Sequence, residues 1–296
     1  MSCYHPLTAY RTKGGDITFR QGQGVGSEIK LPCGQCIGCR LERSRQWAMR
    51  CMYESQMHVD NCFLTLTYSD EYLPSGGSLR GRDFSLFIKR LRKRISPKRI
   101  RFFACGEYGS EGRAHYHAII FGHDFSDKTF FKKSPSGEPV FISETLTSVW
   151  GLGHATIGDV TFDSCGYVAR YCLKKVNGDR KEAHYRRIVP ETGEIIDLVP
   201  EFSRMSLKPG IGKDWYEKFR SDVFPSDFLV VNGQRVNPPR YFDNLLKRED
   251  EDLLERIKLK RVRQASRFKA DQRPERLKVR EKVVKARVSQ LKREGV

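Results

Sequence analysis

The sequence predicts an α+β fold in which a central antiparallel sheet is flanked by helices, with a cysteine-rich N-terminal module and a basic helical C-terminal tail. Between residues 62 and 175, strand and amphipathic helix patterns follow in the order β-α-β-β-α-β-α, which suits an antiparallel sheet with helices packed on it. A short glycine-containing loop at residues 110–112 joins two of these strands, which is typical of an antiparallel hairpin. The chain of 296 residues is long enough for one large domain or two smaller ones.

The N-terminal module contains a cysteine pattern that is typical of a metal site. Cys33, Cys36 and Cys39 lie in LPCGQCIGCR, and Cys3 is a more distant fourth ligand. Thiolates at C-x-x-C spacing bind Zn²⁺ well, and four sulfurs close a structural site. His5 in place of Cys3, an iron–sulfur cluster and a set of reduced buried thiols remain alternatives. Nine cysteines is an odd number and no signal peptide is evident, so we expect a reducing compartment and no disulfides.

The next elements form the first strand and a basic helix. Residues 41–57 predict an arginine-rich helix that supports or extends a DNA surface, and residues 62–68 (CFLTLTY) predict a strand from their apolar and β-branched content. Residues 83–95 (DFSLFIKRLRKRI) predict an amphipathic helix whose opposite face is basic. That face is suited to DNA phosphates, and it carries Arg90, Arg92, Lys93 and Arg94.

Two histidines on the second strand of the hairpin are the candidate metal ligands. His115 and His117 lie two residues apart in RAHYHAIIFG, so they project from one face of a strand. The preceding strand, IRFFACGEYG, ends near Glu107, and antiparallel pairing places this carboxylate near both imidazoles. Such a set leaves open positions on Mg²⁺ or Mn²⁺ for a phosphate oxygen. A solvated hairpin carboxylate beside ordinary histidines is the alternative.

A tyrosine pair follows on a predicted helix. After a short helix at residues 142–149 and a strand at 154–162, the segment GYVARYCLKK (residues 166–175) predicts a helix capped by Asp163 or Ser164. Tyr167 and Tyr171 are four apart and share one face. A tyrosine oxygen can form a covalent intermediate once it is activated, and Lys174 can steady a developing phosphate charge. Half-buried packing of the two rings is the alternative.

These motifs in this order resemble those of the HUH endonucleases, the rolling-circle replication initiators. The resemblance rests on FLTLTY, GEYG followed by HYH, and a Y-x-x-x-Y helix followed by lysine. It is closer to the replication initiation proteins of microviruses, of the gokushovirus VP4 type, and it covers roughly residues 33–175 together with Cys3. Related initiators often have lysine before the second tyrosine, whereas this chain has Arg170. Arginine keeps the charge but cannot lend a proton, so we expect Arg170 to hold phosphate at most.

The resemblance implies a metal-dependent nickase with strand-transfer activity. Glu107, His115 and His117 would hold Mg²⁺ or Mn²⁺ at the scissile phosphate of single-stranded origin DNA. One tyrosine would attack to form a 5′-phosphotyrosyl link and release a 3′-OH for a host polymerase. The second would attack after one round of synthesis and allow the displaced circle to close without ATP. Lys175 is an expected further DNA contact.

Charge is concentrated in two segments. The formal net charge is +18, which indicates a polyanionic partner. Residues 80–101 hold ten Lys/Arg against one Asp, and residues 247–296 hold eighteen Lys/Arg against nine Asp/Glu. From residue 244 the pattern is helical and Pro274 interrupts it. This tail predicts an oligomerising helical extension, a partly disordered tail that folds on DNA, or a solvated charged helix.

The remaining expectations concern organisation, partners and rival functions. We expect four parts, namely a module at 1–60, a nickase core at 61–178, an accessory region of unassigned role at 179–243 and the tail at 244–296. No run of 18 apolar residues and no P-loop occur, so we expect no membrane span and a separate host helicase in the cytoplasm of a bacterial host. A non-catalytic, zinc-stabilised nucleic-acid-binding protein is the main rival. A two-histidine-motif phosphodiesterase lacks its second motif, and a transposase usually has one tyrosine.

Overall fold

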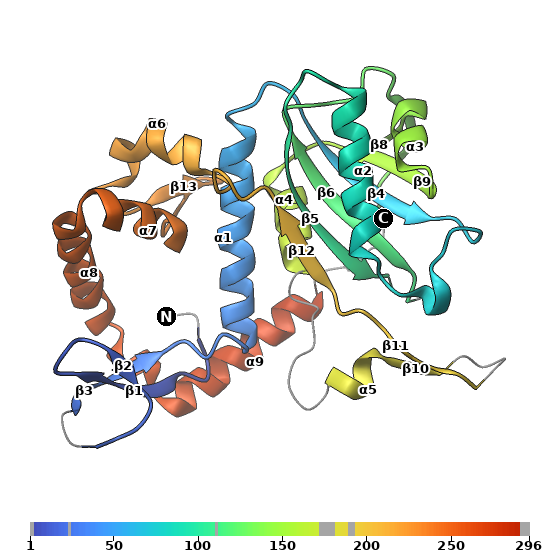
Figure 1. Cartoon of the computed structure of the whole chain (residues 1–296). Coiled ribbons are helices and arrows are strands. Elements are labelled where there is room, and N and C mark those ends of the chain that lie inside the picture. Colours follow the sequence, from blue (N-terminus) through green and yellow to red (C-terminus); the bar gives the residue numbers. More distant parts are fainter. Residues whose placement is uncertain (1–2, 23–24, 110–111, 172–180, 189–192, 291–296) are drawn as a thin grey trace. The chain divides into compact units, whose positions relative to one another are not determined.

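Figure 1 shows the computed structural model, which describes residues 3–22, 25–109, 112–171, 181–188 and 193–290. The chain forms two compact units. One consists of Met1–Arg43 and Asp243–Arg293, and the other of Ser44–Phe242 with Glu294–Val296. The predicted four-part division at residues 60, 178 and 243 stays a prediction.

A seven-stranded sheet forms the centre of the larger unit. Its strand order is β12-β5-β6-β4-β9-β8-β7, and every neighbouring pair is antiparallel. The predicted α+β class with a central antiparallel sheet is therefore confirmed. The strands are β4 (Asn61–Tyr68), β5 (Arg101–Tyr108), β6 (Ala114–Phe121), β7 (Thr129–Lys133), β8 (Pro139–Ile142), β9 (Gly153–Gly158) and β12 (Phe202–Met205).

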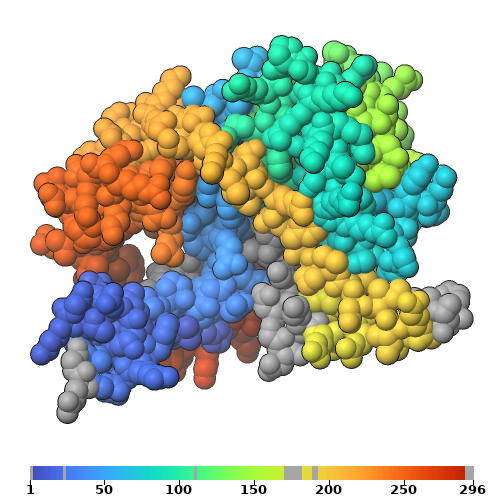
Figure 2. Space-filling view, viewed as in Figure 1, coloured from blue at the N-terminus to red at the C-terminus, as the bar shows by residue number. Residues whose placement is uncertain are grey.

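Helices cover both faces of this sheet, because alternate residues of its strands are apolar on either side. The helices α2 (Gly81–Arg94) and α3 (Glu144–Trp150) pack on one face, against side chains that include Leu64 and Tyr116. The helix α4 (Phe162–Tyr171) and the second half of α1 (Ile37–Ser55) pack on the other face, against Phe63 and Ile119 among others. In Figure 1, α2 lies in front of the sheet, and its atoms form part of the visible surface in Figure 2.

Three local predictions need correction. The strand predicted over 154–162 ends at Gly158, and α4 begins at Phe162. The N-cap of α4 is Thr161 rather than Asp163 or Ser164. Its Oγ1 accepts the Ser164 amide at 3.1 Å, while the Ser164 hydroxyl accepts the Thr161 amide at 2.8 Å. This reciprocal pair is a capping box in which serine takes the usual place of glutamate, and it determines where the tyrosine helix begins.

The sequence pattern also missed strands in two places. The hairpin of β7 and β8 adds two strands at one end of the sheet, and residue 142, predicted to begin a helix, ends β8. The strand β12 adds to the other end beside β5, so part of the accessory region completes the sheet. The remaining elements of this unit are η1 (Ser75–Gly77), α5 (Lys181–Tyr185), β10 (Arg186–Ile188), β11 (Ile195–Asp197), α6 (Lys213–Val223), β13 (Leu229–Val231) and β14 (Gln234–Val236).

Glu54 is a buried charge that ties α1 to the sheet. Its side chain is 1% exposed and accepts hydrogen bonds from the Arg101 guanidinium of β5 and, at 2.6 Å, from the Gly212 amide. Burial alone raises the pKa of Glu54. Bonds from His58, Gly212 and Arg101 outweigh it, so that the pKa lies below its ordinary value of 4.5. A carboxylate held in this way stabilises the folded state only while it is ionised.

We therefore expect Glu54 to make stability fall in acid. Because its folded pKa is depressed, its contribution to the free energy of unfolding is fully present above pH 4.5 and is lost as pH falls below that value. Glu54→Gln should cost about 3 kcal/mol at pH 7 and should flatten the pH profile below 4.5. Urea unfolding followed by circular dichroism between pH 3 and 7 measures both. The exposed Glu71→Gln is the control, and an equally steep acid profile in Glu54→Gln would contradict this account.

The smaller unit combines a short sheet with charged helices. Its three strands are ordered β2-β1-β3, with β1 at Leu7–Thr12, β2 at Ile17–Thr18 and β3 at Val25–Leu31. The tail is helical over the described residues, and Pro274 begins a helix rather than interrupting one, because proline fits the first helical position. The helices are α7 (Arg240–Glu249), α8 (Glu251–Ser266), η2 (Lys269–Gln272) and α9 (Pro274–Gln290). Oligomerisation through this tail stays a prediction.

Among the helices in the described part of the chain, none has both the length and the apolar character that crossing a membrane requires.

Candidate active site

The predicted carboxylate and both predicted histidines meet at one end of the β5–β6 hairpin. Glu107 lies directly opposite His115 in the antiparallel register, and His117 follows two residues later on the same face. Glu107 Oε1 lies 2.8 Å from His115 Nε2 and 3.1 Å from His117 Nε2. One ligand atom from each residue lies within 4.8 Å of the other two. The strand periodicity therefore brings two imidazole nitrogens and one carboxylate oxygen to a single point.

Hydrogen bonds behind the histidines orient their rings. His115 Nδ1 lies 3.1 Å from the Arg113 carbonyl oxygen, which can only accept, so Nδ1 carries the proton there. His117 Nδ1 lies 3.0 Å from the buried Thr65 hydroxyl on β4. Both contacts leave Nε2 directed at Glu107. Ligand histidines in metalloproteins are usually held in this manner by their second ring nitrogen.

The electrostatics of this cluster favour a cation. Burial alone raises the pKa of Glu107, but the hydrogen bonds and charges of His115 and His117 outweigh it and hold the pKa below its usual value. Glu107 is therefore ionised at neutral pH, with a side chain only 2% exposed. A buried carboxylate facing two imidazole nitrogens needs positive charge between them, which a proton or a metal ion can supply. The donor set of two nitrogens and one oxygen fits a divalent cation that keeps open positions.

Tyr167 lies against this cluster from the helix that covers the same face. Its ring meets the His117 ring edge-on, with centroids 5.1 Å apart and planes at 86°. Phe63 stacks on the other side of His117 at 5.6 Å and also contacts Tyr167. Cys165, Val168 and Ala169 of α4 are buried against the sheet, which determines the position of the helix and so of Tyr167. The tyrosine and the histidine pair are thus neighbours, although they are fifty residues apart in the sequence.

The other predicted catalytic residues are only partly described. Tyr171 is the last residue of α4, one turn after Tyr167, and its side chain and that of Arg170 lie outside the described parts of the structure. Lys174 and Lys175 also lie outside the described residues. Their predicted roles stay predictions.

The predicted DNA-binding residues of α2 lie away from the histidines. Because α2 packs on the face opposite α4, its basic side chains do not share a face with Glu107 and His117. The Arg90 guanidinium donates to the Val149 and Trp150 carbonyl oxygens at 2.8 and 2.6 Å, so it holds the end of α3. Of the others, Arg92 lies over the Phe102 ring, and Arg92, Lys93 and Arg94 are all exposed. DNA bound at the histidines reaches this helix only around an edge of the sheet.

Sequence reasoning missed residues that complete the histidine face. Thr65 was seen only as part of a strand, although its position opposite His117 makes it a partner of that ring. His154 on β9 is paired with Thr67, which is itself paired with His115. This row of three side chains crosses the sheet on the side of the cluster, and His154 at its end is exposed. The alternation of the strands contains the signal, but only the strand order reveals it.

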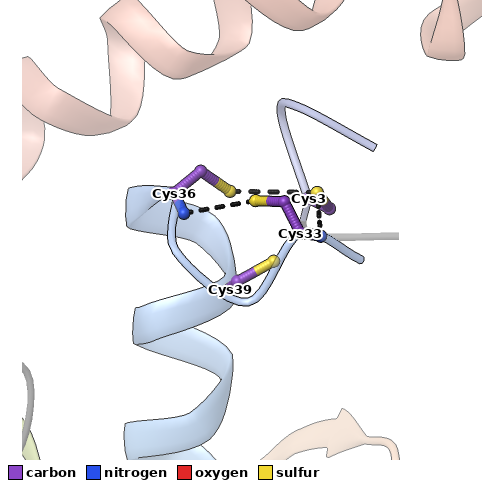
Figure 3. A group of neighbouring side chains, drawn as sticks. All are labelled: Cys3, Cys33, Cys36 and Cys39. Atoms are coloured by element: carbon purple, nitrogen blue, oxygen red, sulfur yellow. Dashed lines mark hydrogen bonds between the residues drawn. The ribbon is translucent and has the colours of Figure 1, made fainter. Parts of the chain in front are cut away.

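The four predicted cysteine ligands also meet, in the smaller unit. Figure 3 shows Cys3, Cys33, Cys36 and Cys39 with their sulfurs turned toward one another at the start of α1. Burial raises the pKa of Cys36. Bonds from the amides of Tyr4 and Cys39 and from the Cys39 and Cys33 side chains outweigh it and bring the pKa to about 6. Cys36 is therefore a thiolate at neutral pH. All four cysteines are free of disulfides, as predicted.

Comparison with known proteins identifies the class of this chain. Residues 61–176, which contain the candidate site, match a family described as replication-associated protein ORF2. The replication-associated protein VP4 of Bdellovibrio phage phiMH2K is 35% identical over 260 residues, covering 84% of this chain and 78% of that protein. The replication-associated protein ORF2 of Spiroplasma virus 4 is 31% identical over 294 residues, with coverage of 90% and 88%.

A third relative is more distant. The replication-associated protein ORF4 of Chlamydia phage 1 is 29% identical over 230 residues, which is 74% of this chain and 54% of that protein. No solved structure matches the chain. On the strength of the first two relatives, the chain belongs to the family of viral replication-associated proteins. The resemblance to microvirus initiators is thereby confirmed.

Proposed function

We propose that this protein initiates rolling-circle replication by nicking single-stranded origin DNA, with Tyr167 as the first nucleophile. The observation that carries the proposal is the edge-on contact between Tyr167 and His117, at 5.1 Å between ring centroids, on the face that Glu107 and His115 share. A nucleophile and a set of metal ligands are useful together only if one phosphate can reach both. Membership in the replication-associated family supports the same reading.

Glu107, His115 and His117 are the residues that would hold the divalent cation. Mg²⁺ or Mn²⁺ bound there would supply Lewis-acid polarisation of the scissile phosphate. His115 is the most exposed of the three, with 15% of its side chain accessible against 2% for Glu107 and 1% for His117. DNA would therefore approach from the His115 side. The exposed His154 on the same face is a further polar contact for the backbone.

Tyr167 would perform the first chemical step. Its phenolic oxygen loses its proton and attacks phosphorus, the phosphotyrosyl bond forms, and the bond from phosphorus to the 3′ oxygen breaks. The departing 3′ oxygen takes a proton and becomes the primer for a host polymerase, with a host helicase opening the duplex. The phosphodiester energy is conserved in the tyrosyl link, so rejoining needs no nucleotide cofactor.

Tyr171 would perform the second transfer. Residues four apart on a helix occupy neighbouring positions on one side, so Tyr171 can address the same place after one round of synthesis. Its attack would release the first strand's 3′ oxygen to close the displaced circle on the Tyr167 link. Arg170, Lys174 and Lys175 supply positive charge along the same segment for phosphate. We place this reaction in the cytoplasm of a bacterial host.

The test is a nicking assay on labelled single-stranded phage origin DNA with Mn²⁺, analysed by denaturing electrophoresis. We expect a band in which the fragment with the new 5′ end remains bound to protein after denaturation, and a free 3′-OH that a polymerase can extend. The rival, a non-catalytic nucleic-acid-binding protein, predicts binding without any covalent product under the same conditions. A reaction that yields cut DNA but no protein-linked fragment would also contradict the proposal.

Thr65 provides a test of metal positioning in the same assay. Thr65→Val removes the hydroxyl that holds His117 Nδ1 and keeps the shape of the side chain. We expect the Mn²⁺ concentration for half-maximal nicking to rise about 10–100-fold, because outer partners of ligand histidines have effects of this size. Isothermal titration with Mn²⁺ should show the same shift, and Thr65→Ser should restore it. If Thr65→Val binds Mn²⁺ with native affinity, Thr65 does not position the ring.

A further inference from the structure

The cysteine cluster has the geometry of a four-sulfur metal site. One sulfur from each of the four cysteines lies within 4.8 Å of the other three, and Cys36 Sγ lies 3.9 Å from Cys3 Sγ. A tetrahedral site with Zn–S bonds of about 2.3 Å places its sulfurs about 3.8 Å apart. The ligands come from the N-terminal residues, the loop before α1 and the first turn of α1 (Figure 3). Side chains so far apart in the sequence share one centre.

Backbone amides point at these sulfurs. The amides of Tyr4, Cys33 and Cys36 donate to the sulfurs of Cys36, Cys3 and Cys33, each at 3.3 Å. Amide donors of this kind offset negative charge on sulfur. Thiolates placed so close together repel one another strongly unless a cation lies among them. The arrangement therefore suits bound thiolates better than a group of neutral thiols.

The C-terminal helix α9 packs on this cluster. Leu277 is 4% exposed and lies in the same apolar group as Cys3, Tyr4 and Cys36. One and two turns further along α9, Glu281 pairs with His5 at 2.8 Å and Val284 packs against the group. Leu277 is the one fully buried side chain of α9 in the described part of the chain. Burying one leucine is worth roughly 2–3 kcal/mol, so docking of α9 depends on the shape of the surface beneath Leu277.

We propose that Cys3, Cys33, Cys36 and Cys39 bind one Zn²⁺, and that this ion shapes the surface on which the basic helix α9 docks. The ion binds the segment of Cys3, Tyr4 and His5 to the start of α1. Without it, Cys3 separates from Cys36, and Leu277 and Glu281 lose the partners that hold α9. The metal thereby controls whether the basic side chains of α9, such as Arg276, Lys278 and Lys282, are presented by an ordered helix. This inference is independent of the nickase proposal.

The first part of the test is metal content. Full-length protein purified under reducing conditions should contain one zinc per chain by elemental mass spectrometry. Cys36→Ala and Cys39→Ser should lose it, whereas the control Cys62→Ala, a buried cysteine of the sheet, should keep it. If the cluster variants do not fold, removal and return of zinc with a chelator on the unmodified protein replaces them. Zinc that survives in both cluster variants, no zinc even after reconstitution, or a visible iron–sulfur absorption band would overturn the proposal.

The second part of the test is the state of α9. Hydrogen exchange of peptides from residues 274–290 should become about tenfold faster or more when zinc is removed, because the docked helix opens. Peptides from α2 in the sheet unit should not change. Leu277→Asp should cause the same acceleration with zinc still bound, since it removes the contact and leaves the metal ligands. Unchanged exchange in α9 after zinc loss would show that the metal does not hold the helix.

Discussion

Replacing Tyr167 by phenylalanine should eliminate the covalent protein–DNA product and slow nicking on the order of 10³-fold or more. The substitution removes the attacking oxygen and keeps the ring that contacts His117 and Phe63. Losses of this size are normal when a nucleophile is removed while binding residues remain. The fold should be unaffected, because the buried neighbours of Tyr167 on α4 are unchanged. Denaturing electrophoresis of labelled origin DNA with Mn²⁺ measures the product.

Two further tyrosine variants make this result specific. Tyr72→Phe changes an exposed tyrosine, with 47% of its surface accessible, in the loop after β4 and should have native activity. Tyr171→Phe should still form the first covalent product but should fail to close circles, because the second nucleophile is missing. A Tyr167→Phe protein that forms the covalent product at the native rate would show that Tyr167 is not the first nucleophile.

Replacing Glu107 by glutamine should reduce Mn²⁺ affinity by more than about 100-fold and nicking with it. The change keeps the shape of the side chain but removes the one negative charge among the three ligands, and outer partners of metal ligands alone account for 10–100-fold. DNA binding at low salt should persist, because it depends on basic residues elsewhere. Isothermal titration with Mn²⁺ and filter binding of single-stranded DNA separate the two effects.

Glu71→Gln is the matched control, since it removes an exposed carboxylate near the same sheet. It should leave Mn²⁺ affinity and nicking unchanged. If Glu107→Gln nicks DNA at the native Mn²⁺ concentration, the cluster of Glu107, His115 and His117 is not the metal centre.

The local geometry of the site was predictable because strands alternate with a period of two. His115 and His117 had to share a face, and a hairpin of matching length had to bring Glu107 across from them. The cysteine spacing was equally informative, because C-x-x-C loops hold their sulfurs close. In both cases the relevant contacts are made within a short segment or across one turn. Cys3 is the exception, because only its residue type indicated it.

Long-range placement was not predictable from the sequence. Nothing in the pattern of β12 shows that it pairs with β5, because strand order depends on the whole sheet. The basic helix α2 was expected to face DNA, but its apolar side chains fit the face opposite the histidines. The bond from Thr65 to His117 likewise exists only because β4 lies beside β6. Propensity describes each element, whereas packing decides its neighbours.

The most direct measurement is the position of the DNA on the protein after reaction. Trypsin separates the two candidate nucleophiles, because Tyr167 lies in the peptide of residues 134–170 and Tyr171 in that of residues 171–174. Mass spectrometry of the nuclease-trimmed covalent product, formed with one round of cleavage, identifies the modified peptide. The account predicts a nucleotide on the Tyr167 peptide only when Mn²⁺ is present and Glu107 is intact. A nucleotide on any other residue, or one that forms equally in Glu107→Gln, would contradict it.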